Sequence, residues 1–276
     1  MLTLEEFIDD QWLNTSLLSE QYSNAKPFPH IVMKSFIKND LINNVLNEFP
    51  DLSQINNTIR FNNEKEVKFA SKGMEQLSPS AFYLCSFLNS NIFLRYLQSL
   101  TSINEKLISD PYMEGGGYHE IKKGGLLKVH ADFSKHSSEL NLDRRLNLII
   151  YLNKDWNKNW GGCLSLFDEN IKESISVSPD FNTAILFSTN SKTYHGHPDA
   201  LNCPENISRK SLALYYFSTG RPSGEIIGKH HGTLFKKRVG EKFRTSNLVK
   251  LQKIAKDISP PFIWASITKI RDKLFY

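Results

Sequence analysis

Cysteine is scarce in this sequence, and long apolar runs are missing. Cys85, Cys163 and Cys203 form an odd set with no close spacing, which argues against a disulfide framework and against a zinc site made of cysteines. The first 18 residues begin with acidic side chains and contain neither a basic segment nor a long apolar stretch, unlike a signal peptide or a membrane anchor. We therefore expect a cytoplasmic protein with no membrane insertion.

Low-complexity segments and internal repeats are also missing. Without a repeat of about 20 to 50 residues, solenoids and propellers are set aside, and the near-average composition excludes collagen-like and coiled-coil chains. The sequence has 276 residues, of which 40% are hydrophobic and 12% aromatic. This is enough to bury a core, and we expect one catalytic domain with additions at its ends.

Positive charge is concentrated at one end of the sequence. Residues 229–276 contain twelve Lys or Arg and three Asp or Glu, a net charge of +9, so the rest of the chain carries −4. A basic tail can bind nucleic acid or an anionic surface, but lysines on the solvated faces of helices give the same composition. We expect no nucleic-acid partner, and the sequence does not define the oligomeric state.

The pattern of apolar residues changes near residue 110. Before it, apolar residues such as Leu41 and Val45 recur at helical spacing, and the segment 26–37 is typical of an edge strand. Residues 1–110 are therefore expected to form a helical and mixed region that packs on the core.

Residues 111–220 alternate short β-branched and aromatic runs with turn residues. About eight strands are expected, around Tyr118 and over residues 126–133, 146–152, 163–167, 175–177, 183–187, 192–195 and 211–217. Short strands at this spacing indicate a sandwich or a barrel. Residues 221–276 are expected to form a basic C-terminal extension with helical segments.

Two side chains of the kind that bind metals lie close together in the stretch KVHADF. His130 and Asp132 are two residues apart in an expected strand, and the period of two directs both to one face. His195 supplies a second histidine at the far end of the β region, and His197 is its rival if that strand continues. Two histidines and a carboxylate leave coordination positions open, as in non-haem Fe(II) oxygenases, although zinc hydrolases use similar ligands.

A carboxylate site is predicted further along the chain. The stretch SRKSLALYYF places Arg209, Ser211 and Ala213 on one face of an expected strand. A guanidinium can clamp a carboxylate through two charge-assisted hydrogen bonds, and the hydroxyl and the small residue suit the same site. The alternative is an exposed arginine at a strand end that pairs with an acidic side chain.

Five segments taken together resemble one family. They are YHEIKKGGLLKVHADF, RRLNLIIYLNKDW, WGGCLSLFD, TYHGHPD and RKSLALYYF. In order and spacing they resemble the prolyl-4-hydroxylase-like branch of the 2-oxoglutarate- and Fe(II)-dependent dioxygenases. The resemblance implies a mainly β fold with flanking helices, whose core is a double-stranded β-helix, the jelly roll of cupin-like proteins.

The resemblance also assigns roles to individual residues. The ligands of the catalytic Fe(II) are then His130, Asp132 and His195. Arg209 falls where the family binds the distal carboxylate of 2-oxoglutarate, the cosubstrate consumed together with O2, and Ser211 matches the hydroxyl that accompanies it. Tyr118 and Asn147 lie where such proteins place further contacts to the cosubstrate or to the ligands.

The activity that the resemblance implies is hydroxylation of an unactivated C–H bond, with release of succinate and CO2. Asp132 argues against a halogenase, in which this position lacks a carboxylate. Tyr215 stands where nucleic-acid demethylases of the superfamily carry a second arginine. The primary substrate stays open between a small molecule and a peptidyl residue. The alternatives are a non-catalytic jelly-roll binding protein and a metal-dependent hydrolase, and Arg209 argues against both.

Overall fold

Strands dominate the second half of the described chain, and four α-helices precede them. The computed structural model describes residues 2–136, 140–222, 225 and 231–241. Its helices are α1 (Thr15–Asn24), α2 (Asn39–Asn47), α3 (Pro79–Leu88) and α4 (Asn91–Thr101), with 3-10 turns at Asp10–Trp12, Met74–Gln76 and Lys158–Trp160. Its strands are β1 (His30–Lys34), β2 (Ile59–Asn62), β3 (Glu66–Ala70), β4 (Ile108–Ser109), β5 (Gly117–Ile121), β6 (Leu126–Ala131), β7 (Asp143–Tyr151), β8 (Leu164–Phe167), β9 (Glu173–Val177), β10 (Thr183–Ser188), β11 (Tyr194–His197), β12 (Arg209–Ser218) and β13 (Leu234–Phe235).

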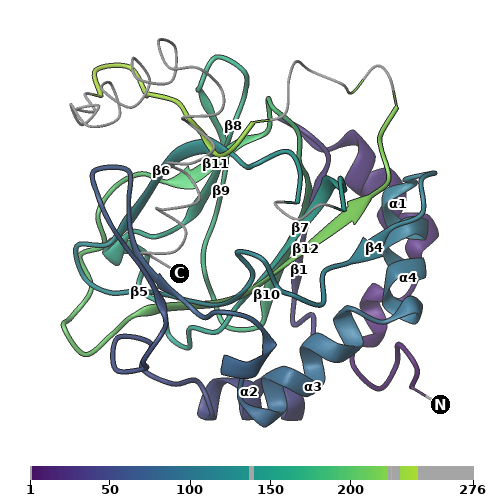
Figure 1. Ribbon diagram of the computed structural model, residues 1–276, viewed down its shortest axis with the longest axis horizontal. Coiled ribbons are helices and arrows are strands. Elements are labelled where there is room, and N and C mark those ends of the chain that lie inside the picture. The colour runs from purple at the N-terminus through teal and green to yellow at the C-terminus, as the bar shows by residue number, and fades with distance from the viewer. Residues whose placement is uncertain (1, 137–139, 223–224, 226–230, 242–276) are drawn as a thin grey trace, which may run out of the picture. The chain divides into compact units, whose positions relative to one another are not determined.

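All of these strands join one antiparallel sheet. Its main path runs β1-β10-β7-β12-β5-β3-β6-β11-β8-β9. Figure 1 shows the sheet curled back on itself, so that β6, β11 and β8 lie opposite β7 and β12. This arrangement is a jelly roll, and it confirms the predicted fold class.

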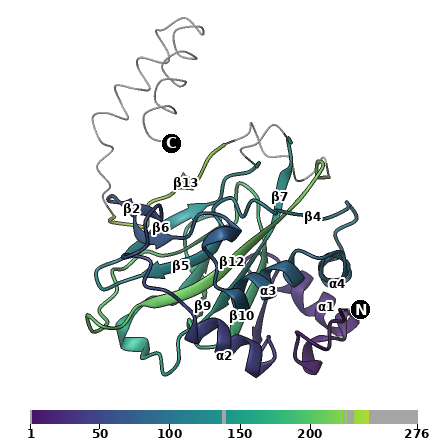
Figure 2. The ribbon, with the colours of Figure 1, turned by 60° about the horizontal axis from the view of Figure 1, so that its bottom comes forward.

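The helices cover one face of the sheet and share a core with it. Figures 1 and 2 show α1 to α4 gathered beside β1, β10, β7 and β12. Leu148 of β7 and Leu214 of β12 belong to the same buried cluster as Leu84 of α3 and Leu97 of α4. Because side chains alternate along a strand, the neighbours of these leucines face the interior of the roll. The helices therefore pack against the outer face of the sheet, and its inner face is left for the site.

Two segments outside residues 111–220 contribute strands to the core sheet. Strand β3, from the region expected to pack on the core, inserts between β5 and β6. Strand β13, from the C-terminal extension, pairs with His130 and Ala131 of β6. The helical segments predicted beyond residue 241 lie outside the described residues.

None of the three cysteines forms a disulfide. Cys85, Cys163 and Cys203 are all free thiols, as expected from their spacing. Within the described residues, no helix has both the length and the apolar character needed to cross a bilayer.

Candidate functional site

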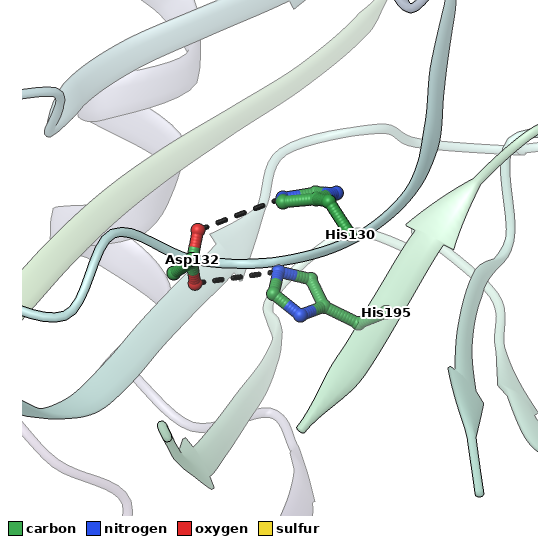
Figure 3. A group of neighbouring side chains, drawn as sticks. All are labelled: His130, Asp132 and His195. Atoms are coloured by element: carbon green, nitrogen blue, oxygen red, sulfur yellow. Dashed lines mark ion pairs between the residues drawn. The ribbon is translucent and has the colours of Figure 1, made fainter. Parts of the chain in front are cut away.

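Three side chains converge at the end of strand β6. His130 lies in β6 and Asp132 directly follows that strand, whereas His195 comes from β11, where it stands opposite His130. Asp132 Oδ1 lies 3.5 Å from His130 Nε2, and Asp132 Oδ2 lies 3.5 Å from His195 Nε2 (Figure 3). One potential ligand atom from each residue lies within 4.8 Å of the others. The structure thus brings together the three residues that the sequence predicts as metal ligands.

Backbone carbonyls fix the orientation of both imidazoles. His130 Nδ1 lies 2.8 Å from the carbonyl oxygen of Lys128, and His195 Nδ1 lies 3.3 Å from that of Thr193. Since a carbonyl oxygen only accepts hydrogen bonds, each Nδ1 donates its proton, which leaves each Nε2 to bind a metal when the ring is neutral. This is the tautomer that a metal-binding histidine needs.

Burial and neighbouring charges set the protonation states of this cluster. Burial opposes ionisation of Asp132, but the Arg144 guanidinium and the two histidines outweigh it and hold the pKa of the carboxyl well below its usual range. Burial lowers the pKa of His195 to about 3. At neutral pH the cluster therefore offers a carboxylate and, at His195, a neutral imidazole. Such a donor set fits a divalent ion such as Fe(II).

Two buried polar residues hold the Asp132 carboxylate in place. Asn147 Nδ2 donates to Asp132 Oδ2 over 2.7 Å, and Arg144 Nη2 lies 3.2 Å from the same oxygen. Arg144 also donates through Nε and Nη2 to Asn147 Oδ1. Its guanidinium lies 3.5 Å from the ring centroid of Tyr215 and 4.2 Å from that of Phe133. Asn147 thus contacts the carboxylate, which is one of the two roles predicted for it.

We expect Asn147→Ala to weaken metal binding about 10- to 100-fold, which is the usual cost of losing a partner that orients a ligand. The substitution removes one hydrogen bond to Asp132 and frees the Arg144 guanidinium to move. Fe(II) affinity, measured by competition with a chelator, tests this, with urea unfolding of the metal-free protein as the control for stability. An affinity equal to that of the wild type would show that Arg144 alone orients the carboxylate.

A second polar group lies in the same cavity as the cluster, at the start of strand β12. Arg209 is 5% exposed, donates from Nε to the carbonyl oxygen of Gly162 over 2.7 Å, and donates from Nη2 to the Tyr151 hydroxyl over 3.2 Å. Gly162 has a φ of +77°, and a side chain there would collide with Leu201, so a glycine is needed for this close approach. Ser211 lines the same cavity and is buried.

The sequence of this region matches a known family. Residues 116–217 match the 2OG-Fe(II) oxygenase superfamily, where 2OG stands for 2-oxoglutarate. This stretch includes the His130, Asp132 and His195 cluster and Arg209. The chain contains a 2OG-Fe(II) oxygenase domain. It is therefore an oxidoreductase, a dioxygenase whose metal is Fe(II) and whose cosubstrates are 2-oxoglutarate and O2.

Solved structures share the fold of this oxygenase domain. A prolyl-4-hydroxylase from Pseudomonas putida is 14% identical with a TM-score of 0.51, and the match covers 74% of this chain and 98% of that one. A prolyl hydroxylase from Trichoplax adhaerens, in complex with a peptide fragment of hypoxia inducible factor, is 16% identical with a TM-score of 0.54, over 75% and 91% of the two chains. An oxygenase of the 2OG-Fe(II) family from Burkholderia pseudomallei is 13% identical with a TM-score of 0.51, over 75% and 92%.

Tyr118, predicted as a cosubstrate or ligand contact, lies outside the cavity of the oxygenase domain. Its side chain belongs to the buried cluster that the helices share with the sheet, and its hydroxyl lies 2.8 Å from Ser78 Oγ. Neighbouring side chains on β5 point to opposite faces, and it is His119 that lines the cavity, where the pairing of β5 with β12 sets it opposite Ser211. The structure thus gives Tyr118 a packing role, and His119, to which the sequence assigned no chemistry, takes the inner position.

We expect Tyr118→Phe to leave the affinity for 2-oxoglutarate unchanged and to lower the free energy of unfolding by about 0.5 to 1.5 kcal/mol, the net worth of one hydrogen bond. Urea unfolding and a 2-oxoglutarate titration of the same preparation check both parts. A large loss of cosubstrate affinity in a stably folded variant would support the cosubstrate contact predicted for Tyr118.

The cavity also contains three further basic side chains, of which the sequence singled out only His197, as a rival of His195. Lys68, His119 and His197 line it together with Arg209. Burial lowers the pKa of His119 to about 3, with a further contribution from Lys68, and burial with the nearby Arg209 lowers that of His197 well below its usual range. Burial likewise lowers the pKa of Lys68. The sequence held a signal for His197, which lies two residues from His195 and so faces the same side of the strand, but none for His119 or Lys68.

The buried histidines predict how stability responds to acid. The unfolded chain binds a proton on histidine near pH 6.5, whereas folded His119 does so only near pH 3. The unfolded state therefore carries more protons between these values, so stability is fully present above pH 6.5 and falls as the pH is lowered toward 3. Urea midpoints measured across this window should show a shallower decline for His119→Gln than for the wild type. Equal slopes would contradict the shift at His119.

Proposed function

We propose that the oxygenase domain hydroxylates an unactivated C–H bond of its substrate, with release of succinate and CO2. The observation that supports this most is the convergence of two groups in one cavity. The cluster of His130, Asp132 and His195 lines it together with Arg209 and Ser211. A hydrolase needs the first group but has no use for a buried clamp for a second carboxylate.

In this proposal His130, Asp132 and His195 hold Fe(II), and Arg209 with Ser211 holds the distal carboxylate of 2-oxoglutarate. When bound, Fe(II) supplies the activation of O2 that decarboxylates 2-oxoglutarate and oxidises the substrate. One oxygen atom enters succinate and the other enters the hydroxyl group of the product. Asn147 and Arg144 keep the Asp132 carboxylate ionised and oriented, while Tyr151 and Gly162 fix the guanidinium of Arg209.

We propose a small molecule or a peptidyl residue as the primary substrate. The Pseudomonas putida and Trichoplax adhaerens proteins are prolyl hydroxylases, and the second is in complex with a peptide fragment. Proline, free or within a peptide, is therefore the first compound to test, and the basic side chains in the cavity make acidic small molecules the second group.

Two measurements test the proposal. Anaerobic addition of 2-oxoglutarate to the Fe(II) protein should show saturable binding, and admission of O2 should then yield succinate, slowly without substrate and faster with it. Tyr118→Phe, which leaves the cavity intact, serves as the matched control for handling of the protein. Failure of the Fe(II) protein to bind 2-oxoglutarate would overturn the proposal and favour the hydrolase.

A further inference from the structure

One buried imidazole in the cavity lacks a hydrogen-bond partner on both of its nitrogens. His197, the last residue of β11, is 3% exposed and lines the cavity. Neither Nδ1 nor Nε2 meets a hydrogen-bonding atom of the part of the chain that the structure describes. Buried polar groups in native proteins are nearly always paired. An orphaned imidazole that faces a ligand cavity therefore points to the ligand as its partner.

The other basic side chains of the cavity are already engaged. Lys68 Nζ lies 3.5 Å from Glu66 Oε2 and 4.7 Å from the ring centroid of Phe61. His119 Nε2 lies 3.0 Å from the carbonyl oxygen of Gly115. Among these residues His197 is thus the one whose hydrogen-bonding capacity is left entirely for a ligand.

His197 lies outside the proposed metal centre. The group of side chains close enough to share an ion consists of His130, Asp132 and His195 and does not include His197. A shift in register between His195 and His197 in the pairing of β11 with β6 separates the two histidines, and His197 stands opposite Leu127. After burial, the charge of Arg209 does most to lower the pKa of this imidazole.

Arg209 and His197 together suit one carboxylate. Arg209 donates its Nε–H to Gly162 and one N–H of Nη2 to Tyr151, which leaves Nη1 and the second N–H of Nη2 without a hydrogen-bond partner among the described residues. A carboxylate has about four lone-pair sites, and one edge of a guanidinium fills two of them. An imidazole N–H from β11, across the cavity from β12, supplies a further donor.

We propose that His197 is a cosubstrate-binding residue, whose imidazole donates a hydrogen bond to the carboxylate of 2-oxoglutarate that Arg209 holds. The inference rests on the proposed function, since it needs 2-oxoglutarate in this cavity. It makes the distal carboxylate a ligand of two strands, β11 and β12. Recognition of a dicarboxylate, rather than of a 2-oxo acid in general, then depends on both residues.

The test uses the full-length protein with Mn(II) in place of Fe(II), under anaerobic conditions, and isothermal titration of 2-oxoglutarate. In His197→Leu the dissociation constant should rise on the order of 10- to 100-fold, the effect of losing one hydrogen bond to a charged group. His197→Gln, which retains a donor, should recover most of this loss. Tyr118→Phe, whose side chain lies in the core outside the cavity, should stay within about threefold of the wild type. Mn(II) affinity should be unchanged in all three variants.

Titration with 2-oxobutanoate, which lacks the distal carboxylate, identifies the end of the cosubstrate that His197 contacts. The preference of the wild type for 2-oxoglutarate should shrink in His197→Leu, while 2-oxobutanoate binds equally to both proteins. Equal weakening of both ligands, loss of Mn(II) in His197→Leu, or unchanged 2-oxoglutarate binding in both His197 variants would each overturn the inference. Absence of 2-oxoglutarate binding to the wild type would instead overturn the proposed function.

Discussion

Replacing Asp132 with alanine is expected to abolish conversion of 2-oxoglutarate to succinate and to reduce Fe(II) affinity by more than about 100-fold. Loss of a partner that merely orients a ligand already costs about 10- to 100-fold, and Asp132 is the only anion in the cluster. The substitution also leaves Arg144, which is 1% exposed, without its carboxylate. Removing one member of a buried ion pair costs roughly 3 to 5 kcal/mol, so the variant should unfold at lower urea.

His130→Ala separates the loss of metal from the loss of stability. It removes a proposed ligand nitrogen but leaves the contacts of Asp132 with Arg144 and Asn147 in place. We expect the same collapse of Fe(II) affinity and of succinate formation, with much less loss of stability. Succinate formation at wild-type rates in both variants, measured with added Fe(II), would show that these side chains do not hold the metal.

The alternation of side chains along strands explains which of the predicted site residues line the cavity. His130 and Asp132 are two residues apart, as are Arg209 and Ser211, and each pair lines the cavity. The role of Tyr118 was predicted from its position in the family pattern rather than from the alternation of side chains along its strand. The strand puts it on the helix side, where a large aromatic ring fills the core. A shift of one residue reverses the face on a sheet, so a small error of alignment is enough to misplace a side chain.

Irregular pairing explains what the sequence could not provide. Arg144 and Asn147 are three residues apart on β7, yet both reach Asp132. The register of β7 with β12 shifts between Tyr216 and Phe217, opposite Leu146 and Arg144, and this bulge turns Arg144 inward. Nothing in the local sequence marks such a bulge. The same holds for β13, a strand of two residues that exists only because β6 offers it an edge.

Long-range pairing also decided between the two histidines of β11. Alternation directs both His195 and His197 inward, so sequence spacing alone left the third ligand open. In the structure His195 stands opposite His130 and next to Asp132, whereas His197 lies beyond the register shift, opposite Leu127. Both histidines of β11 thus line the cavity, but only His195 belongs to the metal cluster.

Replacing Arg209 with methionine is expected to raise the dissociation constant for 2-oxoglutarate by a factor of between roughly 30 and several thousand. The reason is that truncating one partner of a buried charge pair costs about 2 to 5 kcal/mol. Arg209→Lys keeps the charge but loses the planar fork and the bond to Gly162, so it should recover only part of the affinity. Titration of the Mn(II) protein with 2-oxoglutarate measures both.

The specificity of the Arg209 effect is what separates a carboxylate clamp from a structural role. Methionine also leaves the carbonyl oxygen of Gly162 and the Tyr151 hydroxyl without their donor, so some loss of stability is expected with any function. A clamp predicts that 2-oxobutanoate, which has no distal carboxylate, binds to Arg209→Met as well as to the wild type. Equal losses for both acids would mean that Arg209 supports the cavity rather than the cosubstrate, and the proposed hydroxylation would lose its strongest argument against a hydrolase.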